Sequence, residues 1–237
     1  MKNITKLFLY LNLCLTLLAC SKISPKGEIE VKDVTVENFT KLNLKGDFKV
    51  FFAKGNQNLV SVETYPNVYK NLDIEVENGI LTIEENRKTD QVDFYNITIF
   101  GKNDLNEVSL SDKVEMNVSG QVKTPEFSLH LKGNSKFMGA VIAPKSKIEM
   151  AEKSNANILG ETKNLNLKLA DSASIMAPYF YVENLEILSK NGASAGLNID
   201  QEMKGTLENT SKLIFYGEPL NKLIKKDKAS VENRKLK

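Results

Sequence analysis

The sequence has 237 residues, with 32 Lys and Arg against 30 Asp and Glu, so its net charge at neutral pH is only +2. This balance gives no electrostatic basis for binding nucleic acid. Two cysteines and one histidine are too few for a disulfide framework or for a zinc site built on these ligands.

The first 19 residues are predicted to be a lipoprotein signal peptide. Lys2 and Lys6 provide the positive start, and residues 7–18 form an apolar run. That run is shorter than the roughly 20 apolar residues of a transmembrane helix. It ends in Leu-Leu-Ala before Cys20, which resembles the lipobox of bacterial lipoproteins. We therefore expect cleavage before Cys20 and lipid attachment to its thiol; the alternative is an ordinary secretory signal with an incidental cysteine.

A lipid on Cys20 would place the protein in the cell envelope, anchored to a bacterial membrane, with the outer membrane favoured. Residues 20–32 are polar, contain Pro25 and Gly27, and are predicted to be a tether. They lack the acidic cluster that resembles a surface-export signal. The sequence thus favours a periplasm-facing anchor, and exposure on the cell surface is the alternative.

The first half of the chain after this tether shows the period-two alternation of β-strands. Predicted strands span residues 29–36, 41–52, 59–64 and 93–100. Asn78-Gly79 predicts a hairpin, because both positions of a type I′ turn need a positive φ. A turn at this pair places Val76 opposite Leu81 and Ile74 opposite Ile83, so both cross-strand pairs are apolar.

The second half repeats a unit of about 20 residues, a pattern typical of a β-solenoid. Apolar residues recur at steps of 21, 17, 20 and 18, namely Phe127, Ile148, Leu165, Leu185 and Met203. Ten residues after each stands a second position, occupied by Phe137, Ile158, Ile175, Ala195 and Leu213. Small polar residues precede that second position each time, as turns require. The pattern predicts an all-β chain with a parallel β-solenoid in the second half; a β-sandwich is the alternative.

Several segments resemble one known family. They are Phe39–Val50, Phe51–Gly55, Val60–Glu63, Asn78–Ile83 and Val108–Leu110, followed by the repeats. In this order they are similar to the family described as putative auto-transporter adhesin, head GIN domain, common in lipoproteins of Bacteroidetes. The resemblance covers roughly residues 33–217. It implies a right-handed parallel β-helix-like fold on a lipid-tethered envelope protein, and it implies no established activity.

We therefore expect a β-solenoid domain of this type over residues 33–220 and a separate basic tail over residues 221–237. The tail contains seven Lys and Arg against two acids. Leu220, Leu223 and Ile224 have helical spacing, which predicts a short helix covering the last turn of the solenoid. The alternative is contact of the tail with anionic lipid.

The sequence contains no recognisable catalytic group. His130 alternates with Phe127, Leu129 and Leu131, so its side chain is expected at the surface. The segment Gly192–Gly196 matches the G-x-S-x-G motif of hydrolases, but no helical pattern and no histidine follow it. We expect no enzyme activity, no metal and no cofactor. A β-helix polysaccharide lyase with clustered acids is the enzymatic alternative.

Tyr179 and Tyr181 are the candidate binding residues. They flank Phe180, so alternation along a strand places both tyrosines on one face and Phe180 on the other. Exposed tyrosines there would suit stacking on a glycan or contact with a protein; the favoured alternative is that these aromatics cap the turns of the solenoid or fill the core. The sequence predicts a non-catalytic, lipid-anchored adhesin or binding module, alternatively a purely structural envelope lipoprotein. It does not determine the oligomeric state.

Overall fold

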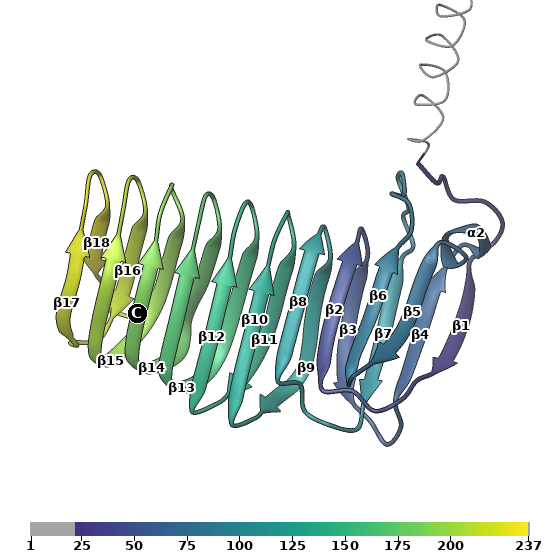
Figure 1. Ribbon diagram of the computed structural model, residues 1–237, viewed down its shortest axis with the longest axis horizontal. Helices are drawn as coiled ribbons and strands as arrows, with labels where there is room; N and C mark the ends of the chain where they lie inside the picture. Colours follow the sequence, from purple (N-terminus) through teal and green to yellow (C-terminus); the bar gives the residue numbers. More distant parts are fainter. Residues whose placement is uncertain (1–21, 237) are drawn as a thin grey trace, which may run out of the picture.

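The computed structural model describes residues 22–236, which form an elongated β-solenoid (Figure 1). The one helix within this range, α2 (Pro66–Tyr69), lies near the N-terminal end. The strands are β1 (Glu30–Thr35), β2 (Lys41–Gly46), β3 (Lys49–Lys54), β4 (Leu59–Thr64), β5 (Leu72–Glu77), β6 (Ile80–Glu85), β7 (Asn96–Gly101), β8 (Glu107–Asp112), β9 (Glu115–Lys123), β10 (Glu126–Leu131), β11 (Lys136–Ile142), β12 (Lys145–Met150), β13 (Asn155–Leu169), β14 (Ser174–Ser189), β15 (Ser194–Leu207), β16 (Lys212–Tyr216), β17 (Leu220–Lys225) and β18 (Ser230–Asn233).

The strands form two long faces that enclose one core. The first face runs β5, β6, β2, β8, β10 and β12, continues through the second halves of β13, β14 and β15, and ends at β17. The second face runs β1, β4, β7, β3, β9 and β11, continues through the first halves of the same long strands, and ends at β16 and β18. Among the strands of the described part of the chain, only the pairs β5–β6, β1–β4 and β4–β7 are antiparallel. The predicted all-β fold with a parallel solenoid is confirmed, and the sandwich alternative is wrong.

Inner side chains stack in columns because successive turns are in register. One column contains Phe127, Ser146, Leu165, Leu185 and Met203, with steps of 19, 19, 20 and 18 residues. A second column, ten residues further on, contains Phe137, Ala156, Ile175, Ala195 and Leu213. The ten-residue offset is therefore confirmed, but the assignment of Ile148 and Ile158 to these columns is wrong. Both residues also face the core, two positions along their strands, in neighbouring columns.

One corner of the solenoid carries a residue with positive φ in every turn. These corner residues are Asp112, Gly133, Glu152, Asp171, Asn191, Asn209 and Asp227. Asn and Asp tolerate this left-handed conformation better than most residues. The chain can therefore form most of these corners without a glycine. Neighbouring corners are linked, since the Asn209 amide donates to Asn191 Oδ1 at 2.6 Å. From Gly133 onward, the residue two positions after each corner is a serine or an alanine that turns inward, and Ala173 and Ala193 are fully buried.

The predicted hairpin in the first half is confirmed. Asn78 and Gly79 have φ values of 51° and 75°, and the register pairs Val76 with Leu81 and Ile74 with Ile83. The single predicted strand over residues 41–52 is wrong, because the chain turns between β2 and β3. Gly46 allows this turn at a φ of 152°, where a Cβ would lie 2.6 Å from Phe48 Cε1.

The described part of the predicted tether, from residue 22, contacts the domain. Ile23 forms a β-bridge with Thr89, and the Lys26 backbone N–H donates to Asn67 Oδ1 at 2.8 Å. The predicted strand over residues 29–36 is present as β1, which begins inside the predicted tether. The signal peptide and Cys20 lie outside the described residues, so cleavage and lipid attachment stay predictions.

The basic tail forms the last turn of the solenoid and contains no helix in its described part. β17 pairs with β15, and β18 pairs with β16, both in parallel. The helix prediction is wrong because the free edges of β15 and β16 offer hydrogen-bond partners along the whole segment. Leu223 faces the core, whereas Leu220 and Ile224 are 57% and 59% exposed. Their three- and four-residue spacing therefore does not define one buried stripe.

Candidate ligand-binding surfaces

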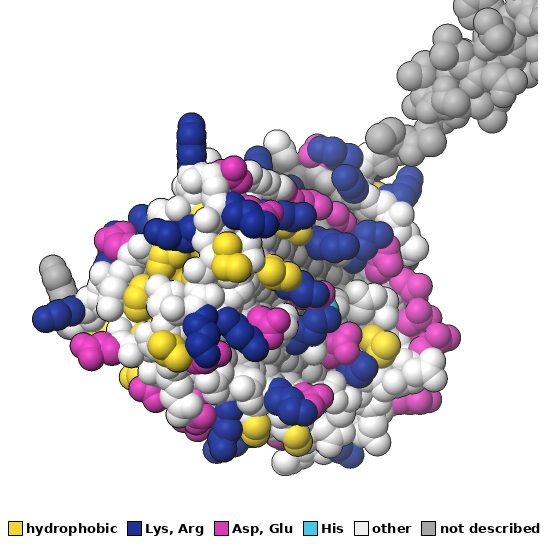
Figure 2. Space-filling model, turned by 60° about the vertical axis from the view of Figure 1, so that its left-hand side comes forward, with side chains coloured by type: hydrophobic (Ala, Val, Ile, Leu, Met, Phe, Trp, Pro, Cys, Tyr) yellow, Lys and Arg dark blue, Asp and Glu magenta, His cyan; other side chains and the backbone are white. Residues whose placement is uncertain are grey.

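Outward side chains form ladders on both faces, because the same register that builds the core also aligns the surface. Lysines and arginines alternate with acids and small hydrophobic patches over much of the face seen in Figure 2. Many of these charges pair with a neighbour in the next turn, as in Lys145–Glu126 at 2.7 Å and Lys226–Glu208 at 2.8 Å. Exposed pairs of this kind add little stability each, but a paired group is already neutralised within this chain.

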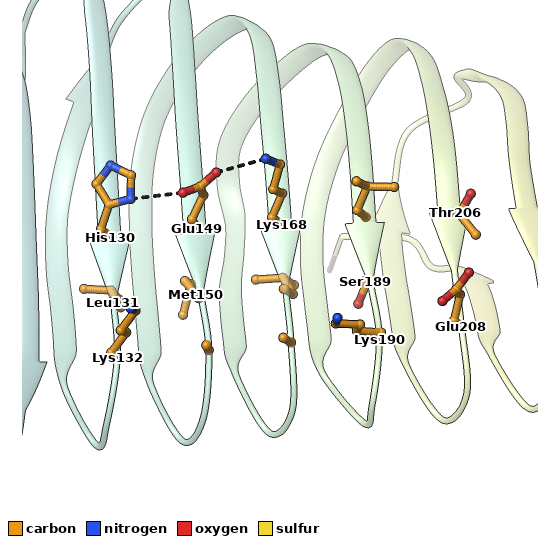
Figure 3. A pocket seen from close by; sticks show the side chains of 14 residues that line it. His130, Leu131, Lys132, Glu149, Met150, Lys168, Ser189, Lys190, Thr206 and Glu208 are labelled. Atoms are coloured by element: carbon orange, nitrogen blue, oxygen red, sulfur yellow. Dashed lines mark ion pairs between the residues drawn. The ribbon is translucent and has the colours of Figure 1, made fainter.

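His130, the candidate surface histidine, lies at one such ladder on the first face (Figure 3). Its Nδ1 is 3.3 Å from Glu149 Oε2, and the ammonium groups of Lys147 and Lys168 each lie 3.1 Å from Glu149 Oε1. Partial burial acts to raise the pKa of Glu149, but the hydrogen bonds from the two lysines outweigh it and hold this pKa below its ordinary value. The prediction of an outward histidine is confirmed.

A groove of about 550 Å³ follows this ladder toward the corner of the solenoid. Small residues at Ala151 and Ala170 open it, while Lys132 and Lys190 lie on either side of them in the same outward row. The central carboxylate, Glu149, is already neutralised by residues of this chain. The network of His130, Glu149 and Lys168 is therefore satisfied internally, whereas Lys132 and Lys190 form no ion pair within residues 22–236.

A second groove, of about 510 Å³, lies beside Tyr181. Tyr181 is 55% exposed and stacks in register between Glu161 and Asn198 of the adjacent turns. Glu183, Asp200 and Lys163 also line this groove, so it holds three carboxylates and one ammonium group beside one exposed phenol ring. Within residues 22–236, no ammonium group lies within ion-pair distance of these three carboxylates. The groove thus combines an aromatic platform with acceptors that are free for a ligand.

The two candidate tyrosines are both at the surface. Tyr179 is 54% exposed, and Phe180 between them is fully buried, so the predicted alternation is confirmed and the core alternative is wrong for the tyrosines. Only Tyr181 lines the acidic groove. Glu183 follows Tyr181 by two residues in β14, whereas Glu161 and Asp200 come from the turns on either side, so no sequence signal identified these two as partners of Tyr181.

The hydrolase-like segment occupies a corner and the start of β15. The Ser194 hydroxyl donates to Ser174 Oγ at 2.9 Å, on the second face of the solenoid. His130 lies on the first face, in β10, so the two residues do not form a catalytic pair. Among residues 22–236, no group of three or more His, Cys, Asp and Glu is arranged to hold a metal ion. None of the helices in that range is both long and apolar enough to span a membrane.

The family described as putative auto-transporter adhesin, head GIN domain, matches residues 38–219, which is most of the chain. The chain belongs to this family. The resemblance of the early strands and later repeats to the head GIN domain is thereby confirmed. No curated protein matches the sequence of this chain.

Solved structures share the fold of this head GIN domain protein at low sequence identity. A putative adhesin from Bacteroides fragilis superposes with a TM-score of 0.82 at 15% identity, covering 90% of this chain and 100% of its own. A putative adhesin from Parabacteroides distasonis gives 0.73 at 15% identity, with the same coverage. A putative lipid binding protein from Parabacteroides distasonis gives 0.69 at 17% identity, covering 92% of this chain and 100% of its own. At these identities the likeness shows the fold alone.

Proposed function

We propose that this head GIN domain protein is a non-catalytic binding module of the bacterial cell envelope, anchored by lipid on Cys20. The apolar segment over residues 7–18 and the Leu-Leu-Ala sequence before Cys20 support the anchor. The family, and the adhesin descriptions of proteins with the same fold, support a binding role. An outer-membrane location with the protein facing the periplasm is the favoured arrangement, and the cell surface is the alternative.

The ligand that we propose is a glycan held in the groove beside Tyr181. The carrying observation is that the exposed Tyr181 ring lines one groove together with the carboxylates of Glu161, Glu183 and Asp200. Sugar rings stack their apolar faces on aromatic side chains. Carboxylates accept hydrogen bonds from sugar hydroxyl groups, and here none of the three is occupied by a lysine of the described chain. A rigid solenoid holds these groups in place, so little entropy is lost on binding.

A glycan array with purified protein tests the ligand class. Tyr181→Ala should weaken binding of every glycan that the native protein retains, by about fivefold or more, because one stacking contact contributes about 1 kcal/mol or more. Tyr179→Ala is the matched control, since Tyr179 is equally exposed but lies outside the groove. Equal losses for both variants, or no retained glycan, would contradict this assignment.

Protease treatment of intact cells tests the location separately. Degradation in intact cells would place the domain at the cell surface, and protection until the outer membrane is opened would place it in the periplasm. Either outcome is compatible with a binding module, but only the first allows adhesion to other cells.

A further inference from the structure

The two ends of the solenoid expose unpaired strand edges. Among residues 22–236, β17 and β18 at the C-terminal end each pair with one neighbour only, and so do β5 and β1 at the N-terminal end. Figure 1 shows these two ends at opposite extremes of the long axis. A free edge presents backbone N–H and C=O groups that can pair with another strand. Solenoids ordinarily protect such ends with a cap.

The core is also incompletely covered at both ends. Leu223 and Val231 in the last turn pack against the core and remain partly exposed. Ile74 and Val76 of β5 do the same at the opposite end. Each end therefore has apolar surface that a further turn of the solenoid would bury. Burial of apolar surface is the dominant favourable contribution to most protein association.

The charges at the two ends are opposite in sign. The outward residues of β5 are Asp73, Glu75 and Glu77, and all three are exposed. The last turn carries an excess of positive charge, with Lys222, Lys225, Lys226, Lys228 and Arg234 against Asp227 and Glu232. Complementary charges favour the contact between unlike ends, and like charges disfavour the contact between two identical ends.

We propose that copies of this chain associate end to end, with β17 of one copy pairing against β5 of the next. β17 runs parallel to the strands of the first face, and β5 runs antiparallel to them, so the new pair is antiparallel. The segment before β1 contacts Thr89 and Asn67 and leaves the outer edge of β5 unpaired. The contact joins different surfaces of the two copies, so it does not close into a dimer and can propagate into a chain of molecules.

The alternation of the two strands restricts the register of this contact. Leu223 faces inward and Lys222 outward in β17, whereas Ile74 faces inward and Glu75 outward in β5. Residues opposite one another in an antiparallel pair point to the same side. Every register that keeps the inner residues together therefore places one of the three β5 acids opposite Lys222 and an apolar residue opposite Leu223. Lys222 pairs with Glu202 in its own chain, and an ammonium group has donors for a second carboxylate.

Sedimentation velocity of the full chain in detergent tests this contact. The native protein should form species larger than a dimer as its concentration rises, and salt should weaken them. Lys222→Glu should lower the association constant by about tenfold or more, because it places like charges together. Glu75→Lys should do the same, because Glu75 is the middle acid of β5 and lies opposite or diagonal to Lys222 in each of these registers. The double variant Glu75→Lys with Lys222→Glu should restore association, since it exchanges the two charges.

Lys204→Glu is the matched control. Lys204 stands directly before Lys222 in the same outward row, one turn inside the solenoid, and lies 3.7 Å from Glu186. Its reversal should leave association unchanged. A protein that stays monomeric at every concentration overturns the proposal, as does an equal loss from Lys204→Glu. Binding of the monomeric protein to anionic phosphatidylserine vesicles, lost in Lys222→Glu, would assign the basic end to lipid instead and also overturn it.

Discussion

Gly205 lies so close to Ile187 of the preceding turn that a Cβ at this position would come within 1.9 Å of the Ile187 carbonyl oxygen. Its φ of 123° is also one that residues with a side chain rarely adopt. The same combination occurs at Gly160 against Val141 and at Gly217 against Ile199. Close approach of the backbones, and not turn formation alone, requires glycine at these positions.

We therefore expect Gly205→Ala to lower the free energy of unfolding by about 3 kcal/mol or more, since strain and overpacking add. Chemical denaturation monitored by circular dichroism measures this loss. Gly120→Ala is the control, because Gly120 has a φ of 80° but no atom within 4 Å of the added Cβ. It should lose only about 1–2 kcal/mol. Equal losses for both variants would contradict the close approach.

Ser146 occupies a place in an inner column whose other members are large and apolar, and its buried hydroxyl has no hydrogen-bond partner among residues 22–236. Replacement by Ala removes a polar group that was desolvated without compensation, so Ser146→Ala should leave stability unchanged or raise it. Ser211→Ala provides the contrast, because Ser211 Oγ donates to the Ser189 carbonyl oxygen at 3.2 Å. That variant should lose about 1 kcal/mol in the same unfolding experiment. A clear loss at Ser146 would indicate a partner for its hydroxyl.

Glu85 lies partly buried beside Gly46 and accepts hydrogen bonds from Thr89 Oγ1 at 3.0 Å and from the Asp47 backbone N–H at 3.1 Å. Burial raises the pKa of Glu85 above its ordinary 4.5, against the opposing effect of these hydrogen bonds. A raised pKa means that the folded protein holds this proton more tightly than the unfolded chain. The stability contributed by Glu85 is therefore greatest in acid and is lost as pH rises from 4.5 through the folded-state pKa.

Glu85→Gln should remove this loss of stability with rising pH. As pH rises from 4 to 7, the unfolding free energy of the variant should therefore increase relative to that of the native protein. Glu208→Gln should show the opposite trend. The hydrogen bond from Lys226 lowers the pKa of Glu208, so its contribution is present above the ordinary carboxyl range and is lost as pH falls. Parallel pH profiles for the two variants would contradict the burial of Glu85.

We predict one covalent modification of this protein, the attachment of lipid to the Cys20 thiol. Cys20→Ala should abolish incorporation of a labelled fatty acid and release the protein from the membrane fraction. Cys14→Ala should keep both, because Cys14 belongs to the segment removed with the signal peptide. Labelling that persists in Cys20→Ala, or is lost in Cys14→Ala, would show that the lipobox is wrongly assigned.

Local patterns in the sequence were sufficient for much of the fold. Asn78-Gly79 sets its own turn and thereby the register of two strands, because both residues accept a positive φ. The ten-residue offset between columns is the number of residues in half a turn. It can be read from the sequence wherever an apolar residue occupies the same position in both halves of a turn. The exposure of Tyr179 and Tyr181 around Phe180 follows from the period of a strand.

Only the tertiary structure decided which turn each residue joins and what it meets there. Ile148 and Ser146 both face the core, and period two cannot show which of them stacks on Phe127; the hydrogen-bonded register selects Ser146. The tail became strand because the edges of β15 and β16 supply partners that its own residues do not reveal. Glu161 and Asp200 come from the turns on either side of Tyr181 and reach its groove through stacking. A sequence records periodicity along one chain, whereas register depends on hydrogen bonds and packing between segments about 20 residues apart.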